Sequence, residues 1–209
     1  MIKGFSFKLI SKVGNARAGV LETPHGSINT PVFMPVGTVG SVKAMSAEDT
    51  ISTGAEIILG NTYHLYLRPG EKIVRKLGQI HKFMRWKGPI LTDSGGFQVS
   101  SLGLFKDKGE VKLSKVDDEG VSFKSFLDGS MHRFTPEKAI EIQEDLGSDI
   151  IMAFDECTPY PCDIHYAKNS MDMTHRWLDR CIKRFQETEP KYHYSKHFFP
   201  LFKEVFTLN

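Results

Sequence analysis

The sequence has no long hydrophobic segment and no close pair of cysteines. No stretch of about 18 apolar residues occurs, and the first ten residues contain no apolar run typical of a signal peptide. The three cysteines, Cys157, Cys162 and Cys181, are odd in number and match no zinc pattern built from close Cys pairs. We therefore expect a soluble cytoplasmic protein with reduced thiols and no contact with a membrane, and we assign no metal ligand.

The sequence also lacks a strong charge bias, internal repeats and low-complexity segments. Its 27 basic and 25 acidic side chains leave a formal charge of +2, with a pI near 8.3. Such a balance does not indicate nucleic-acid binding by itself, although a local basic patch on a near-neutral protein can provide it. A chain of 209 residues, 40% of them hydrophobic, is typical of a globular protein and excludes disordered and fibrous classes.

Short apolar segments alternate with helical patterns along most of the chain. We expect an antiparallel cap (5–10 and 18–22), buried strands (31–36, 55–59, 89–91 and 150–154), helices (47–53, 70–77, 81–86, 136–146 and 164–186), a polar loop (103–120) and a hairpin (121–126 with 131–134). Strands alternating with helices predict an α/β fold of the TIM-type (β/α)8 barrel class. Four such units correspond to about the first half of a barrel, over residues 1–195, followed by an atypical tail at 196–209.

A carboxylate, two glycines and an aromatic ring directly follow the apolar segment at 89–91. Asp93 is expected at the carboxyl end of that strand, and Ser94 follows it. Gly95 and Gly96 permit positive φ and a close approach of a ligand to the backbone, while Phe97 offers a flat face for stacking. This pattern favours a planar, hydrogen-bonding ligand, but a strand-to-helix turn with an aspartate cap would have the same sequence.

A second aspartate, Asp155, follows the apolar segment at 150–154. Because the carboxyl ends of parallel strands meet at one face of a barrel, we expect Asp93 and Asp155 to converge there. Two carboxylates suit displacement at an anomeric carbon, and they equally suit recognition of a guanine-like edge that presents adjacent N–H donors. A pair of structural aspartates in caps or salt bridges is the alternative.

Four long motifs occur in an order that resembles the tRNA-guanine transglycosylase (queuine tRNA-ribosyltransferase) family. They are GNTYHL (60–65), TDSGGFQV (92–99), FKSFLDGS (123–130) and MAFDECTPYP (152–161). The resemblance runs from about residue 5 to the long helix at 164–186. It implies a zinc-containing variant of the eight-stranded barrel and an enzyme that acts on the anticodon loop of tRNA.

The resemblance also implies a reaction and roles for particular residues. The family exchanges guanine at the wobble position of G-U-N anticodon tRNAs for a 7-deazaguanine, which is 7-aminomethyl-7-deazaguanine in bacteria. By position, Asp93 handles protons, Ser94 to Phe97 form the base-binding loop, Asp155 binds the guanine-like edge and Cys157 lies near it. It further implies a homodimer, for which the loop at 36–43 is a candidate contact.

The chain departs from the family pattern in its second half. There the family has the attacking aspartate and the three cysteines and one histidine that bind zinc, and we find no counterpart for them in this sequence. The tail at 200–209 can be read, after a one-base shift of permitted codons, as a family-like Gln-Gly-Gly loop, which suggests a frameshift near 196–199. We therefore expect an amino-terminal fragment of the bacterial type that is inactive alone. The alternatives are a non-catalytic partner subunit of a full-length enzyme and an archaeal-type exchange in the tRNA D-loop.

Overall fold

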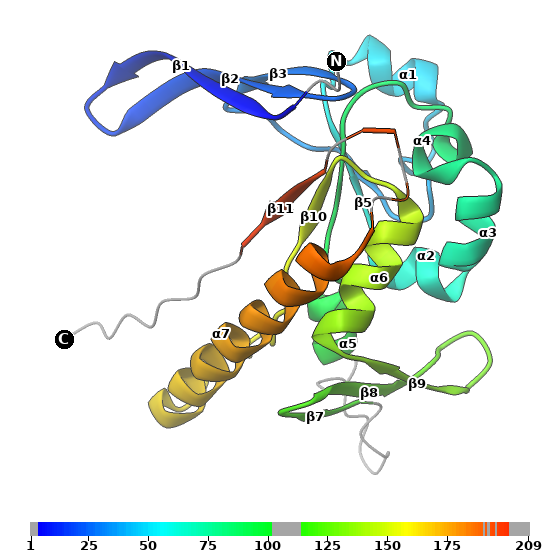
Figure 1. Ribbon diagram of the computed structural model, residues 1–209, viewed down its shortest axis with the longest axis vertical. Helices are drawn as coiled ribbons and strands as arrows, with labels where there is room; N and C mark the ends of the chain where they lie inside the picture. Colours follow the sequence, from blue (N-terminus) through cyan, green and yellow to red (C-terminus); the bar gives the residue numbers. More distant parts are fainter. Residues whose placement is uncertain (1–3, 102–113, 190, 192, 195, 201–209) are drawn as a thin grey trace. The chain divides into compact units, whose positions relative to one another are not determined.

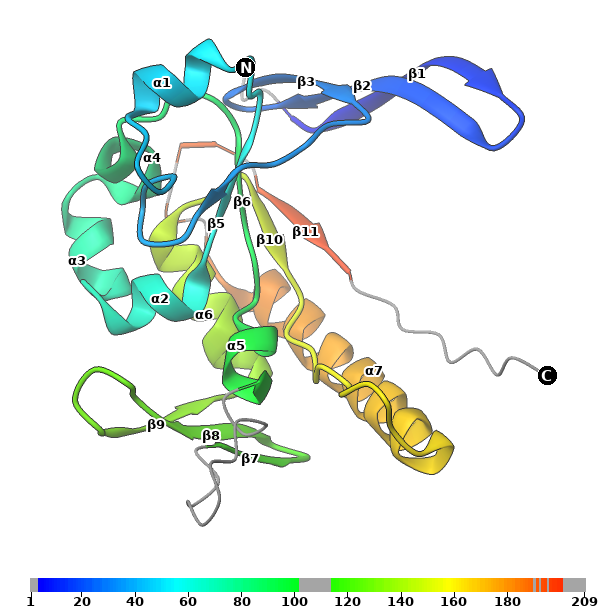
Figure 2. The same cartoon turned by 180° about the vertical axis from the view of Figure 1, so that it is seen from behind.

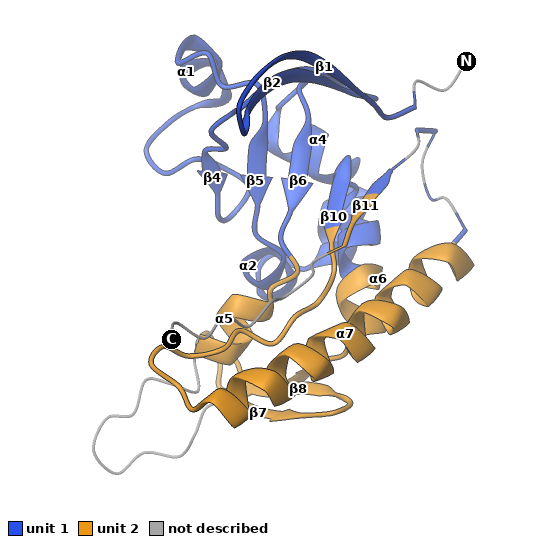
Figure 3. Cartoon of the chain, turned by 90° about the vertical axis from the view of Figure 1, so that its left-hand side faces the viewer, with its two compact units in different colours: residues 1–93, 142–151, 189–197 blue, residues 94–141, 152–188, 198–209 orange. Residues whose placement is uncertain are grey.

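A computed structural model describes residues 4–101, 114–189, 191, 193–194 and 196–200. The chain divides into two compact units (Figure 3). The first contains residues 1–93, 142–151 and 189–197, and the second contains residues 94–141, 152–188 and 198–209. Helix α6 (Pro136–Leu146) contributes residues to both units.

The first unit begins with a three-stranded antiparallel sheet in the order β1-β2-β3 (Figure 1). Its strands are β1 (Ser6–Val13), β2 (Ala16–Thr23) and β3 (Gly26–Thr30). Gly14, in the turn between β1 and β2, has φ +59°, a conformation that glycine adopts without a steric penalty. The predicted antiparallel cap is confirmed, and β3 is a strand that the sequence analysis did not predict.

A second sheet has the order β11-β10-β6-β5-β4, and Figure 2 shows β5, β6 and β10 running alongside one another. Its strands are β4 (Val36–Gly37), β5 (Ile58–Gly60), β6 (Ile90–Thr92), β10 (Ile150–Met152) and β11 (His197–Phe199). The pairs β4/β5, β5/β6 and β6/β10 are parallel. Apolar side chains on three of these strands, Ile58, Ile90 and Ile151, are 2% exposed or less. The predicted α/β class is confirmed, whereas half of an eight-stranded barrel stays a prediction.

Four short helices follow β4 and β5 in the first unit. They are α1 (Ala47–Ser52), α2 (Thr62–Leu67), α3 (Glu71–Lys76) and α4 (Gln79–Met84). Helix α1 begins with a capping box, in which the Ser46 hydroxyl accepts the Asp49 N–H and the Asp49 carboxylate accepts the Ser46 N–H. Helices α1, α3 and α4 confirm predictions, but α2 was not predicted.

The second unit combines an antiparallel sheet with helices. Its strands, in the order β7-β8-β9, are β7 (Ser114–Asp117), β8 (Gly120–Lys124) and β9 (Met131–Phe134), and its helices are α5 (Gly96–Ser101) and α7 (Ile164–Glu187). The core is aromatic: Phe134 packs edge-on against Phe123, and Phe154 stacks on Trp177 with ring centroids 5.1 Å apart. The predicted hairpin and both long helices are confirmed.

Two predicted segments were wrong. Residues 31–35 are not a strand, because Pro31 and Pro35 lack the N–H that a ladder needs. The predicted loop at 103–120 contains β7. The tail at 196–209 contains β11, which pairs with β10, and its atypical character stays a prediction. The remaining parts of those segments at 102–113 and 201–209 lie outside the described residues. In the part that the structure describes, no helix is both long enough and apolar enough to cross a membrane.

Candidate active site

Asp93 directly follows β6, as predicted, and residues after β5 hold its carboxylate. The Asn61 side-chain amide donates to one carboxylate oxygen at 2.7 Å, and the Thr62 backbone N–H donates to the other at 2.8 Å. The Thr62 hydroxyl donates to the Asp93 backbone carbonyl. Because Asn61 is also the N-cap of α2, the start of that helix and the orientation of Asp93 are coupled. These bonds join Asp93 to the start of α2.

Gly95 and Gly96 are each required for a different structural reason. Gly95 has φ +79°, which disfavours any other residue. At Gly96 an added Cβ would collide with the Asp155 backbone carbonyl oxygen and lie 2.7 Å from a carboxylate oxygen of the same residue. The backbone at Gly96 thus approaches Asp155 closely within the second unit, whereas the predicted approach of a ligand to this loop stays a prediction.

Ser94 joins the loop to Asp155 as well. Its hydroxyl lies 3.4 Å from the Asp155 Oδ1 atom and accepts the Gly96 N–H at 3.2 Å. Asp155 is half-buried, whereas Ser94 is only 5% exposed. Phe97, in the first turn of α5, is 62% exposed, so its ring has the free surface that stacking requires. Their binding roles stay predictions.

Glu156 is a buried carboxylate beside Asp155 that the sequence analysis did not identify. It is 2% exposed; the Tyr166 hydroxyl donates to it at 2.6 Å and the Ser170 hydroxyl donates to its other oxygen. Its backbone N–H donates to the Thr174 hydroxyl at 3.2 Å. Burial, and then the hydrogen bond to Glu156, raise the pKa of Tyr166 well above its ordinary value. Hydroxyls at 166, 170 and 174 are one helical turn apart on α7, a signal that the sequence did contain.

A cavity of about 590 Å³ lies next to Glu156 within the second unit. Cys157, Tyr166, Asn169 and Met173 are among the residues that line it. Cys157, which was predicted to lie near Asp155, is half-buried and lines this cavity. Asp93 belongs to the first unit and Asp155 to the second, and their predicted convergence stays a prediction.

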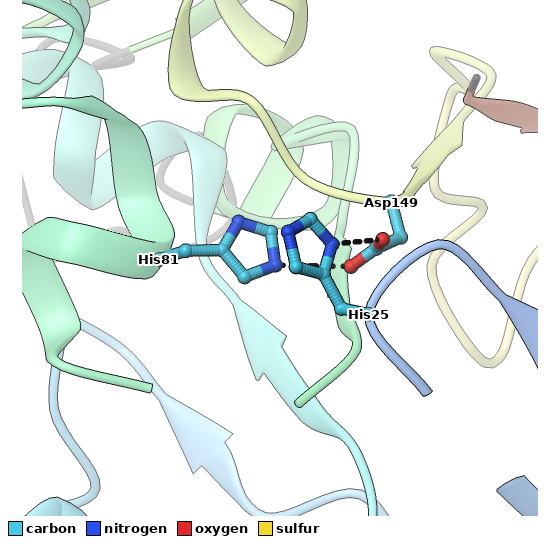
Figure 4. Close-up of side chains that lie close together, drawn as sticks. All are labelled: His25, His81 and Asp149. Atoms are coloured by element: carbon cyan, nitrogen blue, oxygen red, sulfur yellow. Dashed lines mark hydrogen bonds and ion pairs between the residues drawn. The ribbon is translucent and has the colours of Figure 1, made fainter. Parts of the chain in front are cut away.

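A further cluster, which we call the His-Asp-His cluster, consists of His25, His81 and Asp149 in the first unit (Figure 4). His25 Nδ1 lies 2.6 Å from one oxygen of Asp149, and His81 Nε2 lies 3.0 Å from the other. The Ile90 backbone N–H also donates to the carboxylate, whose side chain has no exposed surface. Burial raises the pKa of Asp149, but these N–H groups outweigh it and hold the pKa at about 2.

Among the described residues, the His-Asp-His cluster is the group whose composition could suit a metal ion. Its geometry does not fit one. The imidazole rings stack with centroids 3.8 Å apart and planes only 21° apart, whereas a metal lies in the ring plane about 2 Å from each nitrogen. One ion cannot lie in two nearly parallel planes, so we describe the cluster as a hydrogen-bonded clamp. The zinc expected in the full-length family stays a prediction, as does the absence of its ligands from this chain.

The sheet of parallel strands, with the Asp93 and Asp155 loops after β6 and β10, is typical of α/β enzymes that bind ligands at the carboxyl ends of strands. The family model for queuine tRNA-ribosyltransferase matches residues 12–202. The chain therefore belongs to the queuine tRNA-ribosyltransferase family, a TIM-barrel type of transferase, as the motifs predicted.

Several curated proteins of this family are similar in sequence to this chain. A queuine tRNA-ribosyltransferase of Thermoanaerobacter sp. (strain X514) is 58% identical over 185 residues, which cover 88% of this chain and 47% of the relative. Proteins of the same name from Herpetosiphon aurantiacus and Natranaerobius thermophilus are 56% and 54% identical, and the matches cover 87% and 90% of this chain. The chain spans about half the length of these relatives.

Proposed function

We propose that this chain carries the base-binding part of a tRNA-guanine transglycosylase. The full-length enzyme would exchange guanine at the wobble position of tRNA for a 7-deazaguanine, with bacterial 7-aminomethyl-7-deazaguanine favoured. The observation that carries this proposal is the contact of the Ser94–Gly96 loop with Asp155, in a chain that belongs to the family. This contact joins two segments that the motif resemblance had already assigned to base binding.

Asp155 is proposed to bind the guanine-like edge. A carboxylate accepts an N–H and an NH₂ side by side, and such charge-assisted pairs are about twice as strong as neutral ones. Stacking on Phe97 would add about 1–3 kcal/mol for any base, so it cannot select guanine alone. Selectivity therefore rests on Asp155, because the wrong base would leave its carboxylate unpaired.

Asp93 is proposed to handle protons in the exchange. Asn61 and Thr62 occupy both of its carboxylate oxygens, so they act as positioning residues that fix its orientation. The attacking aspartate and the zinc ligands belong to the remaining half of the family's length, and on this proposal the chain alone does not complete the exchange. Dimer formation and a cytoplasmic location are part of the same proposal.

Binding of the free base tests the proposal. Saturation-transfer NMR with 7-aminomethyl-7-deazaguanine should give a signal with the wild-type chain that guanosine, which lacks a free base, does not displace. Asp155→Asn should abolish it, because an amide presents a donor where the base also presents one. Asp179→Asn is the matched control, since Asp179 is exposed on α7. Equal signals from both variants would refute the role of Asp155.

An assay of guanine exchange distinguishes a fragment that is inactive alone from a complete enzyme. Incorporation of labelled guanine into unmodified tRNA should be absent with this chain alone. Normal turnover would contradict the proposal that the attacking group lies elsewhere. Turnover that appears only when a full-length relative is present, and exceeds that of the relative alone, would instead indicate a partner subunit.

A further inference from the structure

The charge of this chain is unevenly distributed. Residues 68–87 carry seven basic side chains and one acidic side chain, whereas the other 189 residues carry 20 basic and 24 acidic ones. A segment of 20 residues is thus strongly cationic in a chain whose remainder is slightly anionic. The basic side chains are Arg68, Lys72, Arg75, Lys76, Lys82, Arg85 and Lys87, and we call them the α3–α4 basic surface.

The fold turns these side chains outward. Val74, Ile80, Met84 and Trp86 from the same segment are at most 8% exposed, so they define its inward face. All seven basic residues are exposed. The one acidic residue, Glu71, is 6% exposed and so contributes little to the outer face.

The basic residues also lie close together. Helices α3 and α4 pack against each other and lie side by side in Figures 1 and 2. Lys72 and Lys76 are four residues apart, which places them on one side of α3 about 6 Å apart along its axis. The Lys82 side chain folds back over Gly78, at the junction of the two helices. Lys82 therefore lies at the junction between the basic residues of α3 and those that follow α4.

Among the described residues, most of these basic side chains have no ion pair. In the part of the chain that the structure describes, Arg75 is the member with an ion pair, to Asp145 at 3.2 Å. The only acidic side chain in the segment is the buried Glu71, so four lysines and two arginines remain directed at solvent. Unpaired lysines on flexible stems suit a polyanion with many equivalent sites better than one carboxylate.

We propose that the α3–α4 basic surface binds the phosphate backbone of an RNA. This inference rests on the proposed function, which supplies tRNA as the polyanion. The surface would contact phosphates without reading bases, and so would hold the tRNA while the Asp155 loop binds the base. Helices of six residues are too short for the insertion that a membrane-binding helix makes.

Salt-dependent binding tests this proposal. Fluorescence anisotropy would measure the Kd of labelled unmodified tRNA and of oligouridylate between about 0.05 and 0.2 M salt. The test variant changes Lys72, Lys76, Lys82 and Lys87 to glutamine. The control variant changes Lys8, Lys12, Lys124 and Lys168, which are exposed elsewhere, and so has the same net charge.

For the wild-type chain, log Kd should rise with log salt. The test variant should bind either RNA at least about tenfold more weakly at low salt, and its slope should fall by about 0.7–0.9 per lysine that contacts a phosphate. The control variant should keep the slope. Arginine at the same four positions should restore it, which shows that the surface charge and not misfolding is responsible.

Equal losses from the test and control variants would show a net-charge effect and overturn the proposal, as would no RNA binding by the wild-type chain at low salt. Binding of an acidic protein with no binding of RNA would assign the surface to another partner. Failure of the proposed function looks different: 7-aminomethyl-7-deazaguanine would not bind, while the RNA slope would still depend on the four lysines.

Discussion

Two aspartates on either side of the short strand β10 differ in burial and in hydrogen bonding. Asp149, before the strand, has no exposed surface and accepts hydrogen bonds from two histidines and the Ile90 N–H. Asp155, after it, is half-buried and lies 3.4 Å from one serine hydroxyl. The first carboxylate is enclosed by protein donors, whereas the second is partly exposed.

This difference agrees with the general division of labour in α/β folds. Residues at the amino ends of parallel strands mostly stabilise the fold, and those at the carboxyl ends form sites. The His-Asp-His cluster ties together the turn after β2, helix α4 and the start of β10, and the Tyr194 ring packs edge-on against His25 at 4.7 Å. Asp149 thus holds segments of the first unit together, whereas the binding of a ligand by Asp155 stays a proposal.

The largest expected effect is that of Asp149→Asn on stability. The change leaves two histidines and a backbone N–H facing an amide that can accept through only one atom. Loss of one partner of a buried charged group costs about 3–5 kcal/mol. Urea denaturation monitored by circular dichroism would measure it, and a loss below about 1 kcal/mol would show that the clamp does not hold the fold.

Acid should weaken the fold through the same carboxylate. The pKa of Asp149 is about 2 in the folded chain against an ordinary value of 3.8, so the unfolded chain binds the proton more readily. Its contribution is therefore complete above about pH 4 and lost as the pH falls to 2, amounting to roughly 2 kcal/mol at about 1.4 kcal/mol per pH unit. Denaturation curves at several pH values would show this step, and the step should be missing from Asp149→Asn.

Asn61→Ala should have a smaller effect than either change at Asp149. Asn61 is the N-cap of α2, and the substitution removes its donor to Asp93 and its acceptor for the His64 N–H. A lost cap and one lost hydrogen bond cost about 1–2 kcal/mol together, because solvent reaches the half-buried Asp93 and replaces part of what is lost. Thermal denaturation would measure the loss of stability. A loss equal to that of Asp149→Asn would contradict the view that residues at the carboxyl ends of the strands contribute less to stability than Asp149.

Asp155→Asn should change stability least, by less than about 1 kcal/mol. Its carboxylate is half-buried, so solvent replaces part of what the substitution removes. The same variant should lose binding of the base, so stability and binding would separate at this residue. Denaturation and NMR titration of one sample would compare them, and strong unfolding by the substitution would place Asp155 with Asp149 among structural residues.

Local patterns predicted those elements whose signals lie in consecutive residues. The helical patterns at 47–53, 136–146 and 164–186 correspond to α1, α6 and α7 of the structure. Elements defined by distant partners were missed: β11 forms where its backbone meets β10, and no pattern in the tail predicted that pairing. Residues 31–35 were apolar enough for a strand, but their prolines could not supply the hydrogen bonds.

The site shows the same limit. Asp93 and Asp155 were predicted because each follows an apolar run in a long motif. His25, His81 and Asp149 come from three separate segments, and nothing in the sequence shows that they meet. Glu156 lies inside a recognised motif, yet its burial depends on hydroxyls from α7. Sequence thus indicated candidate site residues, but not the residues that contact and orient them.

Carbon-13 labelling of the aspartate side chains gives the most direct test that Asp93 and Asp155 serve one ligand site. On titration with 7-aminomethyl-7-deazaguanine, the carboxyl signals of both residues should shift together, with one binding constant, while the signal of the clamped Asp149 stays fixed. A titration in which the Asp155 signal does not move, or in which Asp149 alone responds, would contradict the account.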